Sequence, residues 1–374
     1  MQRTGTAKLP LHYGKAPTWL TQRMEKLGRE IATIIINEHG AEEFLRRISD
    51  PFWFQALGCV LGYDWHSSGV TTVLTGVLKR AVLPEKHGIG VCGGKGKFSR
   101  QTPSEITALS KKFDFSEEET EKLLYASKMS AKVDNTAIQA GYQLYHHAFI
   151  LCENGEWSVI QQGMCAQDRT ARRYHWLSDN VKSFVVEPHN AIVCDVKHEA
   201  VLDMTAKESE GSRKASVDIA KETPRKLQQL IPSARPLYQK SLQEWLSNKT
   251  ESETPIEALS MPLNINWQAL KEVYEFQPRN YEELLGFKGV GPATVRGLAL
   301  IAELVYGEKP SWKDPVKYSF AYGGKDGVPY PVDRKAMDES IQLLKHAVDE
   351  ARIGNKEKFQ SLQRLRRFVP ESRF

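Results

Sequence analysis

The sequence predicts an α+β protein that is predominantly helical and has more than one domain. The chain has 374 residues, which is above the usual size of a single domain. Apolar residues recur at helical spacing through most of it, and two strand-like runs with a turn signal between them occupy 143–163. We expect an N-terminal α+β domain with a small antiparallel sheet over 1–204, a basic helical connector over 205–250, and an all-helical domain over 251–374.

Residues 18–82 are expected to form helices and one loop. Apolar side chains at spacings of three and four predict helices over 18–47, and Asp50-Pro51 ends that pattern. The run 52–61 is apolar on too many sides for a surface helix, so it belongs in the core. A turn-rich loop over 62–69 leads into a further helix over 70–82.

A β-hairpin is the clearest structural signal. The strand-like runs 143–152 and 156–163 are joined at Asn154-Gly155, a pair favoured in two-residue hairpin turns. With that turn, His147 lies opposite Gln162. The middle of the hairpin is apolar on both faces, so we expect other elements to cover both.

Weaker sequence patterns predict the elements in the rest of the chain. Further strands are expected at 181–186 and 191–196, on either side of Pro188. Residues 265–305 are expected to be helical with turns, and another helix is expected at 334–349.

Composition excludes several classes of protein. Hydrophobic residues make up 41% of the chain and charged residues 26%, so it can bury a core. The apolar run 31–36 is far too short to span a membrane, and the polar start lacks the apolar stretch of a secretory signal, so we expect a cytoplasmic protein. Five cysteines without a C-x-x-C pair argue against disulfides and a cysteine-rich zinc module, and are expected as buried thiols.

The net charge of +5 hides an uneven distribution. Three segments, 91–112, 205–250 and 351–374, hold 21 of the 51 basic residues but only eight of the 46 acidic ones. Basic segments on an acidic body are expected of a protein that binds phosphates. The alternative for each segment is an ordinary solvated surface.

The first of these segments contains a glycine-rich basic loop at 92–100. Its sequence, CGGKGKFSR, does not match the pattern of a nucleotide-hydrolysing P-loop. We predict that Lys95, Lys97 and Arg100 contact nucleic-acid backbone and that Phe98 offers a surface for base stacking. The alternative is a mobile surface loop.

The most specific signal in the sequence lies at 281–300. A helix is expected to end at Leu285, and a tight turn at 289–291 precedes Pro292, which begins a second helix. Glycines allow close backbone approach, and free N–H groups at a helix start can hold a phosphate oxygen without reading sequence. The residues predicted to contact nucleic acid here are Lys288, Gly289, Val290, Gly291, Ala293, Thr294 and Arg296.

This stretch resembles the helix-hairpin-helix motif of DNA-repair and recombination proteins. Pro331-Val332-Asp333 is similar to the segment bearing the catalytic aspartate in helix-hairpin-helix base-excision glycosylases. The resemblance implies that Asp333 helps the sugar–base bond to break and stabilises positive charge on the sugar. Ala293 stands where that family has its lyase lysine, so no Schiff-base chemistry is implied, and 312–330 resembles an insertion. The alternative role for Asp333 is capping of the following helix.

The chain as a whole resembles an uncharacterised prokaryotic family of unknown function. The resemblance rests on 5–12, 52–69 and 93–97. It implies no activity, but it indicates that the N-terminal half is specific to this family.

Candidate catalytic residues lie around the predicted β-hairpin. Hydrolysis of a phosphodiester needs a group that orients water and a group that neutralises charge on phosphorus, commonly carboxylates with a divalent ion or His with Arg or Lys. One end of the hairpin is expected to gather His146, His147, Gln161 and Gln162. The other catalytic candidates are Asp64, His66 and Asp134, and the neighbouring Arg172 and Arg173 are predicted to contact nucleic acid. Asp64, Asp134 and His147 are the candidate metal ligands, with Mg²⁺ or Mn²⁺ as the expected ion, and the alternative for each histidine is a satisfied core or surface residue.

Three functions stay open at this point. The first is a DNA-processing nuclease whose helical hairpin binds backbone and whose N-terminal domain hydrolyses phosphodiesters. The second is a monofunctional base-excision glycosylase acting through Asp333. The third is a non-catalytic, structure-specific nucleic-acid binder. All three bind nucleic-acid backbone, and DNA is favoured over RNA as the partner.

Overall fold

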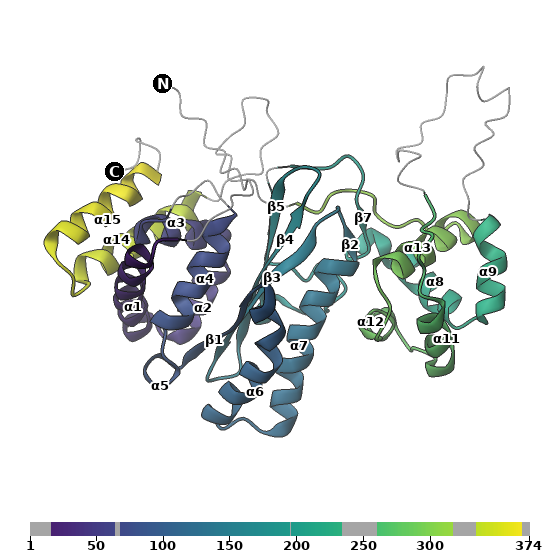
Figure 1. Cartoon of the computed structure of the whole chain (residues 1–374), viewed down its shortest axis with the longest axis horizontal. Coiled ribbons are helices and arrows are strands. Elements are labelled where there is room, and N and C mark those ends of the chain that lie inside the picture. Colours follow the sequence, from purple (N-terminus) through teal and green to yellow (C-terminus); the bar gives the residue numbers. More distant parts are fainter. Residues whose placement is uncertain (1–15, 64–67, 195, 234–259, 317–333, 369–374) are drawn as a thin grey trace, which may run out of the picture.

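A computed structural model describes residues 16–63, 68–194, 196–233, 260–316 and 334–368. Its architecture is the predicted one, an α+β fold that is mostly helical. An antiparallel sheet lies at the centre, helices cover both of its faces, and a further group of helices lies beside it (Figure 1).

The chain begins with helices that pack on one face of the sheet. They are α1 (Thr18–His39), α2 (Ala41–Ser49), α3 (Pro51–Leu61), α4 (Gly69–Ala81) and the short α5 (Pro84–His87). Asp50 ends α2 and starts α3, because its carboxylate accepts a hydrogen bond from the Trp53 N–H at 2.7 Å and Pro51 follows it. Nearly every side chain of α3 is buried, which confirms that 52–61 belongs to the core.

Five strands form the main sheet in the order β1-β3-β4-β5-β6. They are β1 (Ile89–Lys95), β3 (Gln143–Cys152), β4 (Trp157–Cys165), β5 (Thr170–Leu177) and β6 (Ala191–Val193). The hairpin of β3 and β4 and the strand beginning at Ala191 are therefore confirmed. The strand expected at 181–186 is wrong, since that segment is irregular and follows a short 3-10 turn, η2 (Ser178–Asn180).

The register of the β-hairpin differs from the prediction by one residue. His147 lies opposite Gln161, and His146 lies opposite Gln162. The loop has three residues, because Cys152 pairs with Glu156 and the Gly155 N–H donates back to the Cys152 carbonyl. Gly155 has φ +89°, the left-handed residue of a three-residue hairpin loop, so Asn-Gly does not form the two-residue turn here.

Helices also cover the second face of the sheet. After β1 come η1 (Gly96–Gln101), α6 (Thr102–Lys112) and α7 (Glu117–Thr136), which starts at a capping box of Ser116 and Glu119. Ile150 and Ile160 pack with the N-terminal helices, whereas Phe149 and Val159 pack on the α7 side. The expectation that both faces of the hairpin are covered is confirmed.

A second helical group lies beyond the short pair β2 (Ile138–Gln139) and β7 (Leu202–Asp203). It consists of η3 (Lys207–Ser209), α8 (Glu210–Ala220), α9 (Pro224–Ser233), α11 (Trp267–Phe276), α12 (Tyr281–Gly286) and α13 (Pro292–Tyr306). Helix α8 packs against α12 and α13, and α9 packs against α11 and α13. The described part of the predicted connector therefore belongs to this group and does not form a separate linker.

The last two helices depart from the predicted domain division. They are α14 (Arg334–Glu350) and α15 (Asn355–Phe368). Leu344, Val348 and Leu365 are buried in the same core as the N-terminal helices, and α14 and α15 contact α3 (Figure 1). The described residues of 251–374 are thus divided between two cores, with α11 to α13 in one and α14 and α15 in the other.

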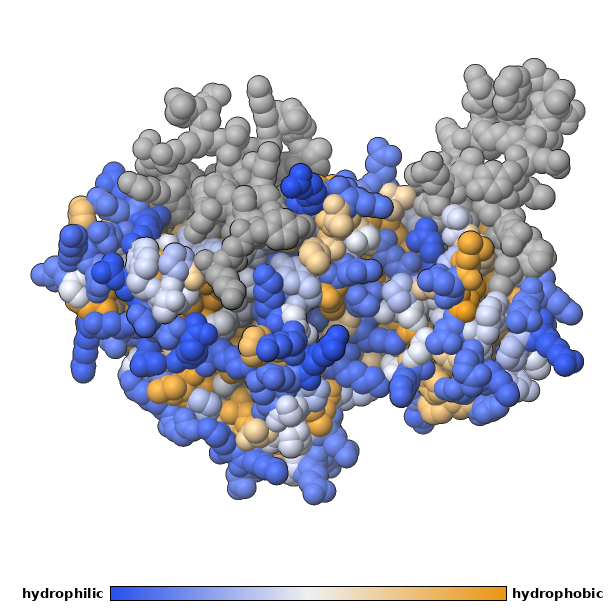
Figure 2. All heavy atoms as spheres, viewed as in Figure 1, coloured by the Kyte–Doolittle hydropathy of each residue, from blue (hydrophilic) through white to orange (hydrophobic). Residues whose placement is uncertain are grey.

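Hydrophilic side chains cover most of the face seen in Figure 2, and apolar residues occur there in separate patches. None of the described helices is both long enough and apolar enough to cross a membrane. All five cysteines are buried with free thiols, as expected.

Candidate nucleic-acid interface and buried polar clusters

Asp134 and His147 belong to one buried chain of hydrogen bonds between α7 and the sheet. The Gln161 amide donates from Nε2 to Asp134 Oδ2 at 2.6 Å. The Gln161 side-chain oxygen therefore accepts a hydrogen bond from His147 Nδ1 at 2.8 Å. Because Nδ1 carries the proton, His147 Nε2 accepts from the Ser127 hydroxyl at 2.9 Å. This chain fixes one tautomer of the His147 ring.

The other oxygen contacts of Asp134 are also made within the protein. The Trp176 indole donates to Oδ2 at 3.0 Å, and His189 Nε2 contacts Oδ1. Burial raises the pKa of Asp134 and lowers the pKa of His147 to about 4, so the imidazole of His147 is neutral near pH 7. The cluster is fully covered, with Asp134 at 0% exposure, and its hydrogen bonds join α7 to the sheet.

Sequence reasoning missed Ser127, Trp176 and His189. Ser127 lies on α7 seven residues before Asp134, two helical turns away, so helical spacing could have placed both on one face. Trp176 on β5 and His189 have no such spacing to Asp134, and for them the available signal was chemical, namely that a buried carboxylate needs several donors around it.

His146 and Gln162 lie on the opposite face of the sheet from His147 and Gln161. Neighbouring residues on a strand point to opposite faces, so the expected single group of four is two pairs separated by the sheet. The His146 ring contacts the Thr75 hydroxyl at 3.1 Å, and burial lowers its pKa to about 3. Gln162 contacts the hydroxyls of Thr71 and Tyr145 and donates to the Ser68 carbonyl at 2.9 Å.

Arg172 and Arg173 are both fully buried, so they are not part of an exposed phosphate-binding surface. Arg172 forms an ion pair with Asp314 at 2.7 Å and lies 4.6 Å from the centre of the Tyr142 ring. Arg173 lies 4.8 Å from the centre of the Phe54 ring, and its guanidinium is 3.3 Å from Gln55 Oε1. The prediction that these two arginines contact nucleic acid is wrong for this structure.

The helical hairpin expected at 281–300 is present as α12, a glycine turn and α13. Gly289 has φ +89°, and a Cβ at this position would lie 2.8 Å from the Cβ of Ala269 on α11. Both the conformation and the packing therefore require glycine.

Protein donors occupy the carbonyl groups of this turn. Lys132 on α7 donates to the carbonyl oxygens of Phe287, at 3.3 Å, and Val290. The remaining donors are Asn266 Nδ2 to the Gly289 oxygen at 3.2 Å and Gln139 Nε2 to the Pro292 oxygen at 2.8 Å. These carbonyl oxygens of the turn thus accept hydrogen bonds from within the protein.

The N–H groups at the start of α13 are open. The N–H groups of Gly291, Ala293 and Thr294 donate to no acceptor among the residues that the structure describes, and Gly291 offers no side-chain cap. Gly291 has φ −115°, which any residue can adopt, and no atom lies within 4 Å of the position of its Cβ. Neither the backbone nor the packing requires glycine at 291.

The side chains predicted to contact nucleic acid in this region differ in exposure. Lys288 is exposed, whereas Val290 and Thr294 are buried. Arg296 is half-buried, with its guanidinium 5.5 Å from the centre of the Trp312 ring. Ala293 is partly exposed beside the open N–H groups.

The glycine-rich basic loop leads from β1 into η1. Lys95, Lys97 and Arg100 are all exposed there. The structure places this loop at an edge of the sheet, since β1 is an outer strand.

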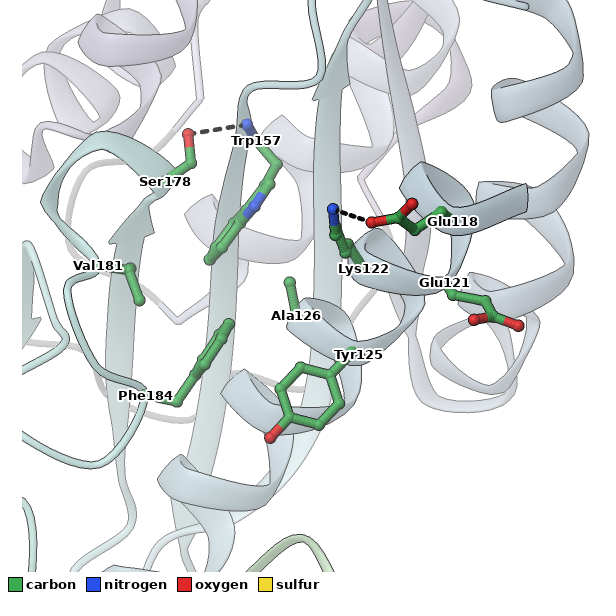
Figure 3. Close-up of a pocket in the computed structure, with 9 residues that line it drawn as sticks. All are labelled: Glu118, Glu121, Lys122, Tyr125, Ala126, Trp157, Ser178, Val181 and Phe184. Carbon is green, nitrogen blue, oxygen red and sulfur yellow. Dashed lines mark hydrogen bonds and ion pairs between the residues drawn. The ribbon is translucent and has the colours of Figure 1, made fainter. Parts of the chain in front are cut away.

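An aromatic pocket of about 610 Å³ lies between α7 and the sheet (Figure 3). Trp157 and Phe184 form its floor, with their rings stacked at 6.2 Å. Glu118 and Glu121 lie at its rim, and Lys122 is paired with Glu118 at 2.6 Å. The net charge of this rim is negative, so the pocket does not suit a phosphate backbone.

Three of the predicted catalytic residues lie outside the described residues, namely Asp64, His66 and Asp333. Within the described ranges, no group of three His, Cys, Asp or Glu side chains is arranged to hold a metal ion. Asp134 and His147 face protein donors and acceptors instead.

Comparison with known proteins assigns a family but no activity. No curated protein and no solved structure matches the chain significantly. A family model described as "Protein of unknown function (DUF763)" matches residues 5–332, which is most of the sequence. The chain therefore belongs to the DUF763 family of proteins of unknown function.

Proposed function

We propose that this protein binds nucleic-acid backbone through the turn between α12 and α13, and that it acts in DNA processing of the repair type. The observation that carries the proposal is Gly291. Its conformation and surroundings would accept a side chain, yet a glycine stands beside open N–H groups. A missing side chain at this position allows a phosphate to approach the backbone closely.

The polarity of the turn supports the same ligand. Its carbonyl oxygens bind Lys132, Asn266 and Gln139, while the N–H groups of Gly291 and Ala293, both partly exposed residues, have no acceptor among the described residues. The N-terminus of α13, a helix of 15 residues, adds a partial positive charge at the same place. The Lys288 side chain is exposed on the turn and can neutralise a neighbouring phosphate.

The variant Gly291→Ala tests this proposal. It adds one methyl group where the protein leaves space, so folding is expected to be preserved and phosphate approach impaired. Affinity for a labelled DNA duplex, measured by fluorescence anisotropy, should fall by roughly tenfold or more if a charge-assisted hydrogen bond is lost.

Gly76→Ala on α4 is the matched control. Gly76 also has no atom within 4 Å of its Cβ position, and α4 lies far from α12 and α13 in the fold (Figure 1). The affinity of the Gly76→Ala variant for the DNA duplex should equal that of the wild-type protein. Equal affinity in Gly291→Ala would remove the support for binding through this turn.

Phosphodiester hydrolysis with Mg²⁺ or Mn²⁺ is a second proposal, and one observation favours a location for it. Ser68, which directly follows the segment bearing Asp64 and His66, accepts a hydrogen bond from Gln162. On this face the sheet also holds His146 and Arg173. His146 and Arg173 are themselves buried, so a nuclease site on this face would depend on Asp64 and His66 for contact with the substrate.

Cleavage assays test the second proposal. Labelled single-stranded, duplex and branched DNA would be incubated with Mn²⁺ or Mg²⁺ and with chelator. Asp64→Asn should abolish metal-dependent cleavage, whereas Asp218→Asn, an exposed position on α8, should not change it. Intact substrates under all conditions would leave backbone binding without hydrolysis.

Glycosylase chemistry at Asp333 stays a prediction. Helix α14 begins at Arg334, directly after Asp333, as the capping alternative also expects. Alkali-dependent strand breakage of damaged duplexes that disappears in Asp333→Asn would distinguish the glycosylase from a capping role.

A further inference from the structure

An exposed group of three cations and one aromatic ring lies at the end of β1 and in η1. Lys95, Lys97 and Arg100 form no ion pair with any described residue, and Phe98 is 49% exposed. The second basic segment differs, because Lys214 and Lys226 on α8 and α9 are paired with acidic residues one helical turn away. Unpaired cations around an exposed ring therefore distinguish this loop, which we call the Phe98 loop (93–101), from those two helices.

The hydrogen bonds of the Phe98 loop hold its two ends. At one end, Glu105 accepts from the Gly93 N–H at 2.6 Å, and Lys79 donates to the Gly93 carbonyl at 2.9 Å. Lys79 and Glu105 also form an ion pair at 2.7 Å. At the other end, Thr102 donates from its buried hydroxyl to the Ser99 carbonyl at 2.8 Å.

Glycines allow the path that the chain takes between these ends. Gly93, Gly94 and Gly96 have φ values of +87°, +140° and +60°, which other residues rarely adopt. A Cβ on Gly93 would lie 2.3 Å from the His147 carbonyl oxygen, so the loop is packed against β3. The alternative of a mobile surface loop is therefore disfavoured, and the exposed side chains are presented by a held backbone.

The side chains are placed to contact two parts of a nucleotide. The Lys97 ammonium lies 5.6 Å from the centre of the Phe98 ring, and the Lys95 ammonium lies 5.8 Å from the centre of the Tyr145 ring. Cations beside aromatic rings can neutralise phosphates while a ring stacks on a base, which is the combination found in sites for single strands. A paired base inside a duplex does not expose its face to such a ring.

We propose that the Phe98 loop binds a single-stranded segment of nucleic acid, with Phe98 stacking on a base and Lys95, Lys97 and Arg100 contacting phosphates. This inference rests on the proposed function and deepens it, because it names a single-stranded region as part of the substrate. The α12–α13 turn binds backbone only and does not require unpaired bases.

Anisotropy titrations of the full chain test the proposal with two probes, a labelled oligo(dT) of about 20 nucleotides and a duplex of the same length. Phe98→Ala should weaken oligo(dT) binding by roughly 5- to 150-fold, which corresponds to the loss of one stacked base. Phe98→Trp should retain it, and duplex affinity should change by less than about twofold because paired bases are inaccessible.

Salt dependence tests the cations separately from the ring. Changing Lys95, Lys97 and Arg100 together to Gln should reduce the slope of log affinity against log salt for oligo(dT) by roughly 2, since each phosphate contact on a single strand contributes about 0.7. The Lys26→Gln variant, at an exposed position on α1 outside the three basic segments, is the control and should leave the slope unchanged.

The outcomes separate this inference from the proposed function. Loss of oligo(dT) binding in Phe98→Ala supports the inference. It does so independently of Gly291→Ala, whose unchanged duplex affinity would overturn binding through the α12–α13 turn. Wild-type affinity of Phe98→Ala for oligo(dT), or no oligo(dT) binding by the wild-type protein at low salt, would overturn the inference. A change in sedimentation of Phe98→Ala without a change in affinity would assign Phe98 to a protein contact and also overturn it.

Discussion

Lys132 on α7 donates a hydrogen bond from its ammonium group to the carbonyl oxygen of Phe287, at 3.3 Å, in the turn of the helical hairpin. The same ammonium contacts the Val290 carbonyl. Burial lowers the pKa of Lys132, because it is half-covered by the elements it joins. Helix α7 also carries Asp134, so one helix connects the sheet's buried polar cluster with the proposed backbone-binding turn.

Lys132→Met should loosen this turn. The substitution keeps much of the side-chain volume but removes one donor from each of two carbonyl groups, although the Phe287 carbonyl still accepts from the Val290 N–H at 3.3 Å. We expect a loss of about 1–3 kcal/mol in the free energy of unfolding and roughly fivefold weaker duplex binding. Lys128→Met, at an exposed position one turn earlier on α7, is the control for both measurements. Equal duplex affinity in the two variants would show that the hydrogen bonds to the turn do not matter for binding.

Gly289→Ala should affect stability, in contrast to Gly291→Ala. Residue 289 has φ +89°, and the added Cβ would lie 2.8 Å from Ala269, so the variant combines backbone strain with a steric clash. We expect a loss of roughly 1–3 kcal/mol in urea denaturation. Gly291→Ala should unfold at the same urea concentration as the wild-type protein. Equal destabilisation of both variants would contradict the geometry of the turn described above.

The elements were predictable where a local pattern decides them. The helices of 18–47, the buried helix at 52–61 and the turn at 289–291 depend on spacing and on Gly and Pro, which are visible in the sequence. The hairpin was also found, but its register was wrong by one residue because Gly155 takes the third position of a longer loop. Because of this one-residue difference, His147 lies opposite Gln161 and Gln162 lies opposite His146.

The long-range arrangement was not predictable in this way. The apolar side chains of α14 indicate that one face is buried, but they do not say which helices cover it, and α1 and α3 do so from the other end of the sequence. Charge was equally ambiguous. Arg172 and Lys95 look alike in a count of basic residues, yet Asp314 neutralises the first inside the protein and the second is exposed.

The stability of the protein should decrease as the pH falls below 6.5, partly through His147. Its folded pKa of about 4 lies below the ordinary value of 6.5, so the unfolded chain takes up a proton first. The resulting loss accumulates between pH 6.5 and about 4 and amounts to about 3 kcal/mol for this residue. Asp134 acts in the opposite direction, because its raised pKa means that the folded state gains its proton earlier.

His147→Gln tests this contribution. The variant removes the titrating ring, so its free energy of unfolding should depend less steeply on pH between 6.5 and 4 than that of the wild-type protein. Urea denaturation at a series of pH values measures both slopes. Parallel curves for the two proteins would mean that His147 does not stay neutral in the folded state.

The ion pair of Arg172 and Asp314 should hold the segment after α13 on the sheet. Both side chains are fully buried, and Asp314 also accepts hydrogen bonds from the backbone N–H groups of His198 and Val316. Removing one partner leaves the other as an uncompensated buried charge. Arg172→Met should therefore lower the free energy of unfolding by roughly 3–5 kcal/mol.

The double variant Arg172→Met/Asp314→Asn provides the decisive comparison. Asparagine keeps an oxygen that can accept from the backbone and carries no charge, so much of the stability should return. Calorimetry or urea denaturation of the four proteins in this cycle gives the coupling energy between the two positions, and coupling below about 0.5 kcal/mol would contradict a buried ion pair. Because Arg172 is inaccessible, duplex affinity measured on the folded double variant should match that of the wild-type protein. A large loss of affinity there would return Arg172 to the set of residues that contact nucleic acid.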